Sequence, residues 1–463
     1  MISHDTMMWF LKEAYLWVWG APFLILFFGS AIYLTIALRG LQFRYLPYAF
    51  KLAFGRQSKH AKGDISRYQS LMTALAATVG IGNIAGVATA LTAGGPGALF
   101  WMWVTALLGM VTKYAESVLA VKYRIVDERG EMAGGPMYFI EHGLGWKKLA
   151  MTFAGFGCLV ALGGGNMLQA NSIADVMDGM FNINPWVTGV VLAILTGLTV
   201  LGGIRSIGIV AGYAVPFMAI FYMLGGFTIL AANIDRIPAA AWSILQDAFS
   251  GTAIGGGFLG FATQNAIRVG LARGIMTSEA GLGTSSIASA AAKTNSPSEQ
   301  GLVSMTGSFL TTVIMCTVTA LVLQVTDATQ MVDAMGVRLN GASMTVGAFQ
   351  TVFDSWGGYL VSMALVFFGF TTIIGYAYYA EKCLEYLFGA KAVPFYRVVF
   401  VIFVVIGSVL HLEVVWMVSD IANGLMAYPN LIGLIALSGV VIKETQQYLD
   451  TFKKVPAKLS VVD

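Results

Sequence analysis

The sequence predicts an all-α polytopic membrane protein, because it is rich in apolar residues that occur in long blocks. Of its 463 residues, 57% are hydrophobic and only 11% are charged, whereas soluble domains carry about 25% charged residues. The segments 23–38, 210–232 and 398–410 contain no charged residue, and a helix needs about 20 apolar residues to cross a bilayer. So few charges cannot cover a water-exposed surface of this size, and we therefore expect a lipid bilayer around the protein.

The apolar blocks divide the chain into eleven expected transmembrane helices. These are 15–38, 68–92, 97–121, 149–177, 186–202, 207–231, 256–291, 301–324, 350–386, 394–411 and 414–442. The block 256–291 is longer than one crossing requires, so we expect a break inside it. Two short segments, 134–145 and 237–250, are expected to lie at the membrane interface instead.

Lysine and arginine are concentrated in alternate loops. One set of loops, which includes 39–67 and 122–148, holds nearly all of them, whereas the opposite set holds only Lys12, Arg236 and Arg338. Because basic loops mark the cytoplasmic side, we expect a multi-pass cell-membrane protein with its N-terminus outside and its C-terminus in the cytoplasm. The net charge of +3 gives no indication of a nucleic-acid partner.

Two matching glycine motifs indicate an internal repeat. Residues 80–83 read Gly-Ile-Gly-Asn and residues 281–284 read Gly-Leu-Gly-Thr, each inside an apolar block and each followed by small residues. Five expected helices begin with the first motif and five with the second. An odd number of helices places the second copy upside down, so the pattern predicts an inverted five-plus-five helix repeat.

This repeat gives the expected domain layout. It comprises an N-terminal transmembrane helix and cytoplasmic basic loop (1–65), the first five-helix repeat (66–235), an external interfacial helix with the second, inverted repeat (236–443), and a cytoplasmic tail (444–463).

A Gly-x-Gly pair at membrane depth favours a broken helix that lines a cavity. The freed carbonyls suit a cation, and the amides that open the next half-helix suit a carboxylate. A zwitterionic amino acid with sodium fits such a site. The alternative is that these glycines only let helices pack closely. One pair alone would favour close packing, whereas two matched pairs favour broken helices.

The segment Gly94–Gly109, which reads GGPGALFWMWVTALLG, resembles the signature of the sodium:alanine (alanine or glycine:cation) symporter family. Residues 78–90, 134–138, 166–171 and 279–283 resemble segments of the same family, so the likeness spans nearly the whole chain. It implies a LeuT-like fold of ten core helices in two inverted repeats, with one extra N-terminal helix. It also implies sodium-coupled import of alanine or glycine by alternating access, with sodium as the coupling ion and no other cofactor.

The first glycine motif also resembles the Gly-Leu-Gly-Asn of the neurotransmitter:sodium symporters. That resemblance implies that Gly80, Ile81 and Gly82 hold the substrate carboxylate and that Asn83 helps to bind sodium. A second sodium site is implied at the carbonyls of Ala76 and Val79 and the hydroxyls of Thr371 and Thr372. Thr78, where the related proteins have a smaller residue, and Gly281 and Gly283 of the second motif complete the expected site.

Polar side chains in apolar blocks supply further candidates. Asn166 and Gln169 share one helical face and are expected either to contact the substrate or to hydrogen-bond between helices. Asn171 is expected to be structural. Asp420 and Asn423 are candidates to line the cavity.

Several charged residues also fall inside apolar blocks. Glu279 directly precedes the second motif, and its expected partner is Arg268 or Arg273, in an ion pair or a gate. Lys113 and Glu116 are predicted to form a helix-surface pair.

Other functions fit the sequence less well. A membrane-embedded enzyme is disfavoured because none of the four histidines forms His-Glu-x-x-His and no paired intramembrane carboxylates are evident. A channel is disfavoured because the repeat favours alternating access. Proton coupling is the main alternative within transport, although the sequence shows no obvious lone carboxylate at the centre of the repeat.

Overall fold

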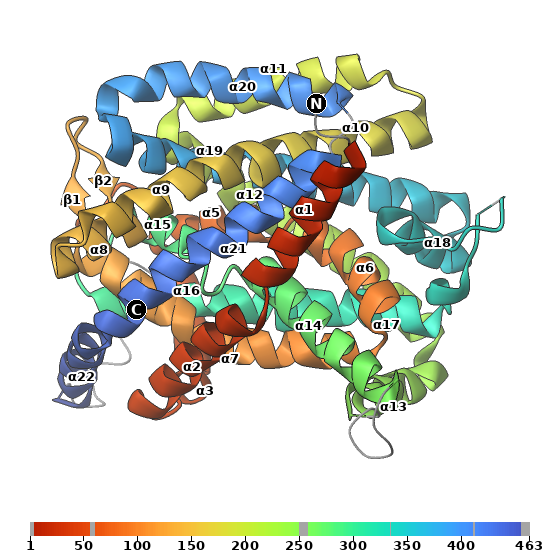
Figure 1. The fold of residues 1–463 in the computed structure, drawn as a ribbon, viewed down its shortest axis with the longest axis horizontal. Helices are drawn as coiled ribbons and strands as arrows, with labels where there is room; N and C mark the ends of the chain where they lie inside the picture. Colours follow the sequence, from red (N-terminus) through yellow and green to blue (C-terminus); the bar gives the residue numbers. More distant parts are fainter. Residues whose placement is uncertain (1–3, 56–60, 250–257, 334, 411–412, 455–463) are drawn as a thin grey trace.

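The computed structural model describes residues 4–55, 61–249, 258–333, 335–410 and 413–454. Within these ranges the chain is almost entirely helical, as predicted, and a two-stranded antiparallel hairpin accompanies the helices. Figure 1 shows the helices running side by side, with the hairpin, α8 and α22 gathered at one end of the bundle and α13 and α18 at the other.

The helices of the first half, with the hairpin strands, are α1 (His4–Val18), α2 (Ala21–Ala37), α3 (Leu41–Arg44), α4 (Leu46–Phe54), α5 (Arg67–Thr78), η1 (Ile81–Asn83), α6 (Ala85–Gly94), α7 (Gly97–Lys122), β1 (Ile125–Val126), β2 (Met132–Ala133), α8 (Pro136–Leu144), α9 (Lys147–Leu162), the π-helix η2 (Gly163–Met167), α10 (Leu168–Phe181), α11 (Pro185–Leu201), α12 (Gly203–Ala232) and η3 (Ile234–Arg236).

Those of the second half are α13 (Ile237–Phe249), α14 (Phe258–Ser278), α15 (Thr284–Ala290), α16 (Pro297–Ser308), the π-helix η4 (Phe309–Met315), α17 (Cys316–Val325), η5 (Ala328–Gln330), α18 (Gly341–Phe353), α19 (Ser355–Phe388), η6 (Ala390–Ala392), α20 (Val393–Val409), α21 (Glu413–Ala436) and α22 (Ser438–Lys454).

Every block that was expected to cross the membrane contains helix, but the structure does not confirm eleven crossings. By length and apolar composition, seven of the described helices can span a membrane, or eight if the α21–α22 pair, bent by 59°, is one span. The other blocks form shorter helices. The expected span 68–92, for example, is split between α5 and α6.

Both glycine motifs interrupt a helix, which confirms the predicted breaks. The first break separates α5 from α6, and the short 3₁₀ turn η1 lies between them. The second break separates α14 from α15, and its residues Glu279, Gly281 and Gly283 have φ values of 52°, 83° and 79°. This left-handed conformation favours glycine over residues with a Cβ atom, which explains the glycines of the second motif.

The two segments expected at the membrane interface differ from each other. α13 is amphipathic, with Ala240, Ile244 and Ala248 buried and Trp242 exposed. α8 has nine residues, too few to cross a membrane, and its residues 136–140 are buried among α7, α9 and α21. Its position at the membrane interface stays a prediction.

Candidate binding site at the two broken helices

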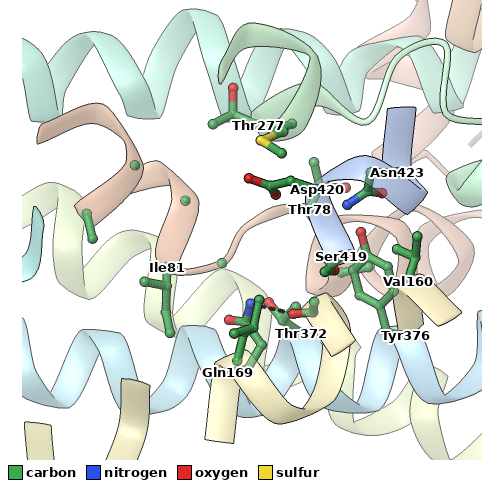
Figure 2. Close-up of a pocket in the computed structure, with 18 of the residues that line it drawn as sticks. Thr78, Ile81, Val160, Gln169, Thr277, Thr372, Tyr376, Ser419, Asp420 and Asn423 are labelled. Atoms are coloured by element: carbon green, nitrogen blue, oxygen red, sulfur yellow. Dashed lines mark hydrogen bonds between the residues drawn. The ribbon is translucent and has the colours of Figure 1, made fainter. Parts of the chain in front are cut away.

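A cavity of about 180 Å³ lies between the two breaks (Figure 2). Its wall combines the first break with α10, α14, α19 and α21. The residues that line it include Thr78, Gly80, Ile81, Gly82, Ala85, Gly86, Val160, Gln169, Arg273, Thr277, Leu282, Thr372, Tyr376, Ser419, Asp420 and Asn423. Segments far apart in the sequence therefore meet at one small chamber that has both polar and apolar walls.

Six of the predicted site residues line this cavity. They are Thr78, Gly80, Ile81, Gly82, Gln169 and Thr372. Gly281 and Gly283 do not reach it, because a Cβ atom on Gly281 would lie 2.9 Å from Phe27, and one on Gly283 would lie 2.5 Å from Pro136. The structure places these two glycines where helices pack closely, and Leu282 between them faces the cavity.

The amides of the first break are not equivalent. The Gly80 N–H donates to the Thr78 carbonyl at 3.1 Å and to Asn83 Oδ1 at 3.2 Å, so it is already used within the break. The amides of Ile81 and Gly82 have no hydrogen-bond partner among the described residues. They lie beside the first turn of α6, and the N-terminus of a helix attracts a carboxylate.

Thr372 links α19 to the first break. Its hydroxyl donates to the Ala76 carbonyl at 3.3 Å and to the Phe368 carbonyl at 2.9 Å. A Cβ atom on Gly80 would lie 2.7 Å from this hydroxyl, so glycine is needed for the close approach. The Val79 carbonyl, which caps α5, has no donor among the described residues. Of the four residues of the second expected sodium site, the structure thus brings Thr372 and Ala76 into direct contact.

Thr371 faces elsewhere. Its hydroxyl lies 3.4 Å from Met218 Sδ on α12 and donates to the Phe368 carbonyl at 3.1 Å. Successive residues of a helix point about 100° apart, which explains why the adjacent threonines do not face the same side.

Asn83 is fully buried and connects the first break to η4 and α17. Its Nδ2 donates to the Thr311 carbonyl at 3.3 Å and lies 3.4 Å from Cys316 Sγ. Thr311 and the next residue, Thr312, bring two hydroxyls to this part of the fold, and these lie 3.4 Å from each other. The sequence reasoning missed this pair, although it is an adjacent threonine pair in an apolar block like Thr371 and Thr372.

The amide side chains of η2 and α10 separate into two roles. Asn166 is fully buried, and its Nδ2 donates to the Phe400 carbonyl on α20 at 2.7 Å, which is an interhelical hydrogen bond. Gln169 Nε2 donates to the Gly164 carbonyl at 3.0 Å, and its Oε1 has no partner among the described residues. Because Gln169 also lines the cavity, it has an acceptor available for a ligand. Asn171 donates to the Leu410 carbonyl at 3.0 Å, as a structural residue would.

Arg273, Asp420 and Asn423 line the cavity, the last two as predicted. Neither Arg268 nor Arg273 forms an ion pair with Glu279 in the part of the chain that the structure describes, so that prediction was wrong. Glu279 instead accepts a hydrogen bond of 2.8 Å from the Tyr376 hydroxyl.

The prediction of a helix-surface pair on α7 was also wrong. Lys113 and Glu116 are both buried and form no ion pair with each other. The reason is the position of α7, which is enclosed by α2, α14, α15 and α16.

One end of the bundle is closed by charged residues. Lys382 Nζ lies 2.7 Å from Asp127 and 3.1 Å from Glu385, and Arg129 lies 3.0 Å from Glu381. These ion pairs fasten the β1–β2 hairpin to α19. Burial raises the pKa of Asp127, but its hydrogen bonds with Glu385 and Lys382 and the charge of Lys382 outweigh burial and lower it to about 2.

Arg124 closes the same end of the bundle. Its guanidinium donates to the carbonyls of Ala290, Ala292 and Thr294, just after α15, at 2.8–2.9 Å. The residues that line the cavity include none from the hairpin, α8 or α22 in the part of the chain that the structure describes. The cavity is therefore separated from this end by the packed and ion-paired layer.

Comparison with solved structures defines the class of protein. The crystal structure of MhsT in complex with L-phenylalanine matches with a TM-score of 0.58 at 13% identity, over 83% of this chain and 90% of that one. The fold is thus the LeuT-like fold of membrane transporters.

The family follows from the sequence comparisons. The model of the sodium:alanine symporter family matches residues 4–460, and the chain belongs to that family. The sodium/alanine symporter AgcS of Methanococcus maripaludis is 52% identical over 93% of this chain and 95% of its own length. The probable sodium/glutamine symporter GlnT of Bacillus subtilis is 32% identical over 93% of this chain and 88% of its own. The protein is a sodium-coupled amino-acid symporter and not an enzyme.

Proposed function

We propose that this symporter imports small neutral amino acids, alanine or glycine, together with sodium. The observation that carries this proposal is the cavity at the first break, where the unpartnered amides of Ile81 and Gly82 face a small chamber. Its modest volume suits a ligand with a short side chain. The related AgcS is named a sodium/alanine symporter, which supports the same substrate.

The substrate carboxylate binds at the Ile81 and Gly82 amides, next to the N-terminus of α6. Gly80 contributes differently from its neighbours, because its amide is used inside the break and its missing side chain admits Thr372. Thr78 and the Gln169 Oε1 atom supply further polar contacts from the cavity wall.

Sodium is bound by neutral oxygen atoms at two places. The first is at Asn83, where the hydroxyls of Thr311 and Thr312 add oxygen ligands. The second is formed by the carbonyls of Ala76 and Val79 with the Thr372 hydroxyl. Hard cations prefer oxygen ligands of this kind. Thr371 joins the second site only if α19 rotates, because its hydroxyl now faces Met218.

Transport proceeds by alternating access between two inverted repeats, 66–235 and 236–443. The extra residues 1–65 and the tail 444–463 flank them. The end closed by Arg124 and the Lys382 ion pairs is the cytoplasmic gate, and the N-terminus lies outside. Two facts support this arrangement. The end with the hairpin, α8 and α22 carries the basic loops. The cavity residues Trp416 and Asp420 come from the half of α21 that is farther from this end.

Uptake of labelled alanine into proteoliposomes tests the function. With an inward sodium gradient, alanine should accumulate above its external concentration. When choline replaces sodium at the same pH on both sides, accumulation should cease. Equal accumulation in choline would exclude sodium coupling, and uptake of neither alanine nor glycine would exclude the proposed substrates.

A further inference from the structure

Three charged residues in the interior, outside the binding cavity, lie close enough to interact electrostatically with one another. Lys113 and Glu116 come from α7 and Glu279 from the second break, and their exposed fractions are 1%, 0% and 1%. Lys113 Nζ, Glu116 Oε2 and Glu279 Oε2 have no hydrogen-bond partner among the described residues. We call these three residues the Lys113 cluster. The proposed transport mechanism assigns no role to them.

The other carboxylate oxygens of the Lys113 cluster accept hydrogen bonds from α19 and α21. Asn430 Nδ2 on α21 donates to Glu116 Oε1 at 2.7 Å and to the Gly281 carbonyl at 2.9 Å. The Tyr376 hydroxyl donates to Glu279 Oε1 at 2.8 Å, and Tyr376 also lines the binding cavity. The cluster therefore lies directly behind the cavity wall and beneath the second break.

The charge of the Lys113 cluster is unbalanced when all three groups are ionised. Two carboxylates and one ammonium leave a net charge of −1, and an uncompensated buried charge costs several kcal/mol. One additional proton makes the cluster neutral. That proton lies on one of the two acids, while the other carboxylate is balanced by the charged Lys113.

The surroundings supply no other charge that would balance the Lys113 cluster. Its polar neighbours are neutral: Thr78 from α5, Thr284 from α15, Tyr376 and Tyr379 from α19, and Asn430 from α21. On α16, Gly307 faces Lys113, and a Cβ atom there would lie 3.5 Å from Nζ. A metal cation at the two free carboxylate oxygens would be repelled by the ammonium, whereas a proton binds covalently to one oxygen.

We propose that the Lys113 cluster is a proton-binding site that carries one proton on the carboxyl groups of Glu116 and Glu279 while the second break is buried. The proton leaves as H⁺ and restores the carboxylate only when water reaches the cluster. Water reaches it when the closed end of the bundle opens, so release belongs to that step of the cycle. This last consequence rests on the proposed function, but the binding of the proton does not.

Infrared spectroscopy of the purified protein tests the site directly, through the C=O stretch of a protonated carboxylic acid. The wild type should show this band. Glu116→Gln and Glu279→Gln should each reduce it, because the remaining carboxylate is then balanced by Lys113. Glutamine keeps an oxygen that accepts from Asn430 or Tyr376, so both variants should fold. Lys113→Met should increase the band, because both acids must then be protonated.

Glu141→Gln is the matched control, since Glu141 also accepts a hydrogen bond from a tyrosine, Tyr386, but lies outside the Lys113 cluster. It should leave the band unchanged. If neither glutamine variant reduces the band, or if Lys113→Met does not increase it, the proposal is wrong. Because Lys113→Met acts in the opposite direction, misfolding of a glutamine variant cannot imitate the expected pattern.

The transport consequence has a separate measurement. Alanine uptake by the wild type should depend on the pH at the side where the closed end opens, and Glu279→Gln should make that pH profile flat. A wild type that takes up no alanine would refute the proposed function while the infrared result stands. A variant profile identical to that of an active wild type would refute the role in transport.

Discussion

Thr371 and Thr372 are adjacent in the sequence, yet their hydroxyl groups face different helices. The resemblance to related transporters implied that both bind sodium. The structure brings only the Thr372 hydroxyl to the Ala76 carbonyl, while Thr371 contacts Met218. Which of two neighbouring residues faces a cavity depends on the rotation of the helix, and an apolar block without a polar face does not reveal that rotation.

Replacing each threonine by valine, which keeps the shape and removes the hydroxyl, separates the two residues. Thr372→Val should raise the sodium concentration for half-maximal uptake by about fivefold or more, because a lost polar ligand costs about 1–3 kcal/mol. Thr371→Val is the control and should change it by less than about twofold. A larger effect at Thr371 would mean that the sodium site lies on the α12 side.

Gly82 offers a second test at single-residue scale. A methyl group on Gly82 would meet no protein atom closer than Thr277 Cγ2 at 3.9 Å, so Gly82→Ala should leave the melting temperature nearly unchanged. The methyl group would instead crowd a carboxylate bound at the neighbouring amides. Alanine affinity should fall by about tenfold or more, as measured by calorimetry at saturating sodium.

Gly155→Ala is the control for this experiment, because Gly155 lies on α9 with open space around it and does not line the cavity. It should leave alanine affinity unchanged and should not lower the melting temperature, because alanine is the better helix former. Wild-type affinity in Gly82→Ala, combined with earlier melting, would mean that Gly82 serves helix packing alone.

The two broken helices follow from one sequence pattern, but the pattern did not predict what each glycine does. Matching Gly-x-Gly motifs in two apolar blocks were sufficient to locate both breaks. At the first break the motif borders the cavity, whereas at the second Gly281 and Gly283 pack against Phe27 and Pro136. Those neighbours come from distant parts of the chain, so the sequence around the motif cannot show them.

The buried charges of α7 were missed for a related reason. Lys113 and Glu116 lie near the end of an apolar block, where charged residues usually mark the membrane surface. A helix enclosed by other helices and a helix that faces lipid have equally apolar sequences, so the sequence did not show that α7 is enclosed.

Gly283→Ala tests the packing role at the second break. Gly283 has a φ of 79°, and a Cβ atom would lie 2.5 Å from Pro136 and 2.7 Å from Asn430 Oδ1. The left-handed conformation costs about 1–2 kcal/mol for a residue with a Cβ atom, and overpacking adds about 1–3 kcal/mol. The melting temperature should fall well below that of Gly155→Ala, whereas the folded fraction keeps its alanine affinity. Unchanged melting with weakened binding would instead place Gly283 at the substrate.

At the scale of the whole molecule, charged residues hold one end of the bundle shut while the cavity lies beyond them. Lys382 is buried among Asp127, Glu131 and Glu385 and fastens the hairpin to α19. Removing one partner of such a buried group costs about 3–5 kcal/mol, because the remaining charges are left uncompensated.

Lys382→Met should therefore release the hairpin. Amide hydrogen exchange of residues 125–133 should become faster, whereas Lys147→Met, which removes only an exposed pair with Glu141, should have no effect. The pKa of Asp127 is lowered to about 2, whereas its usual value lies near 4. Ionised Asp127 therefore stabilises the folded state fully above about pH 4, and this stabilisation is lost only as the pH falls toward 2. Between about pH 5 and 8 Asp127 stays ionised, so its titration should not change the protection of the hairpin amides in the wild type. Equal exchange in Lys382→Met and the wild type would show that the ion pairs do not hold this end closed.

If the first break binds the amino acid and sodium together, each ligand must raise the affinity for the other by the same factor. Calorimetry of the purified protein gives alanine affinity with and without saturating sodium, and sodium affinity with and without saturating alanine. We expect the two factors to be equal, within the usual range of about 5–150-fold. Asn83→Ala should weaken sodium binding directly, and alanine binding only through the loss of bound sodium. Alanine binding that is independent of sodium in the wild type would show that the two ligands do not share the first break.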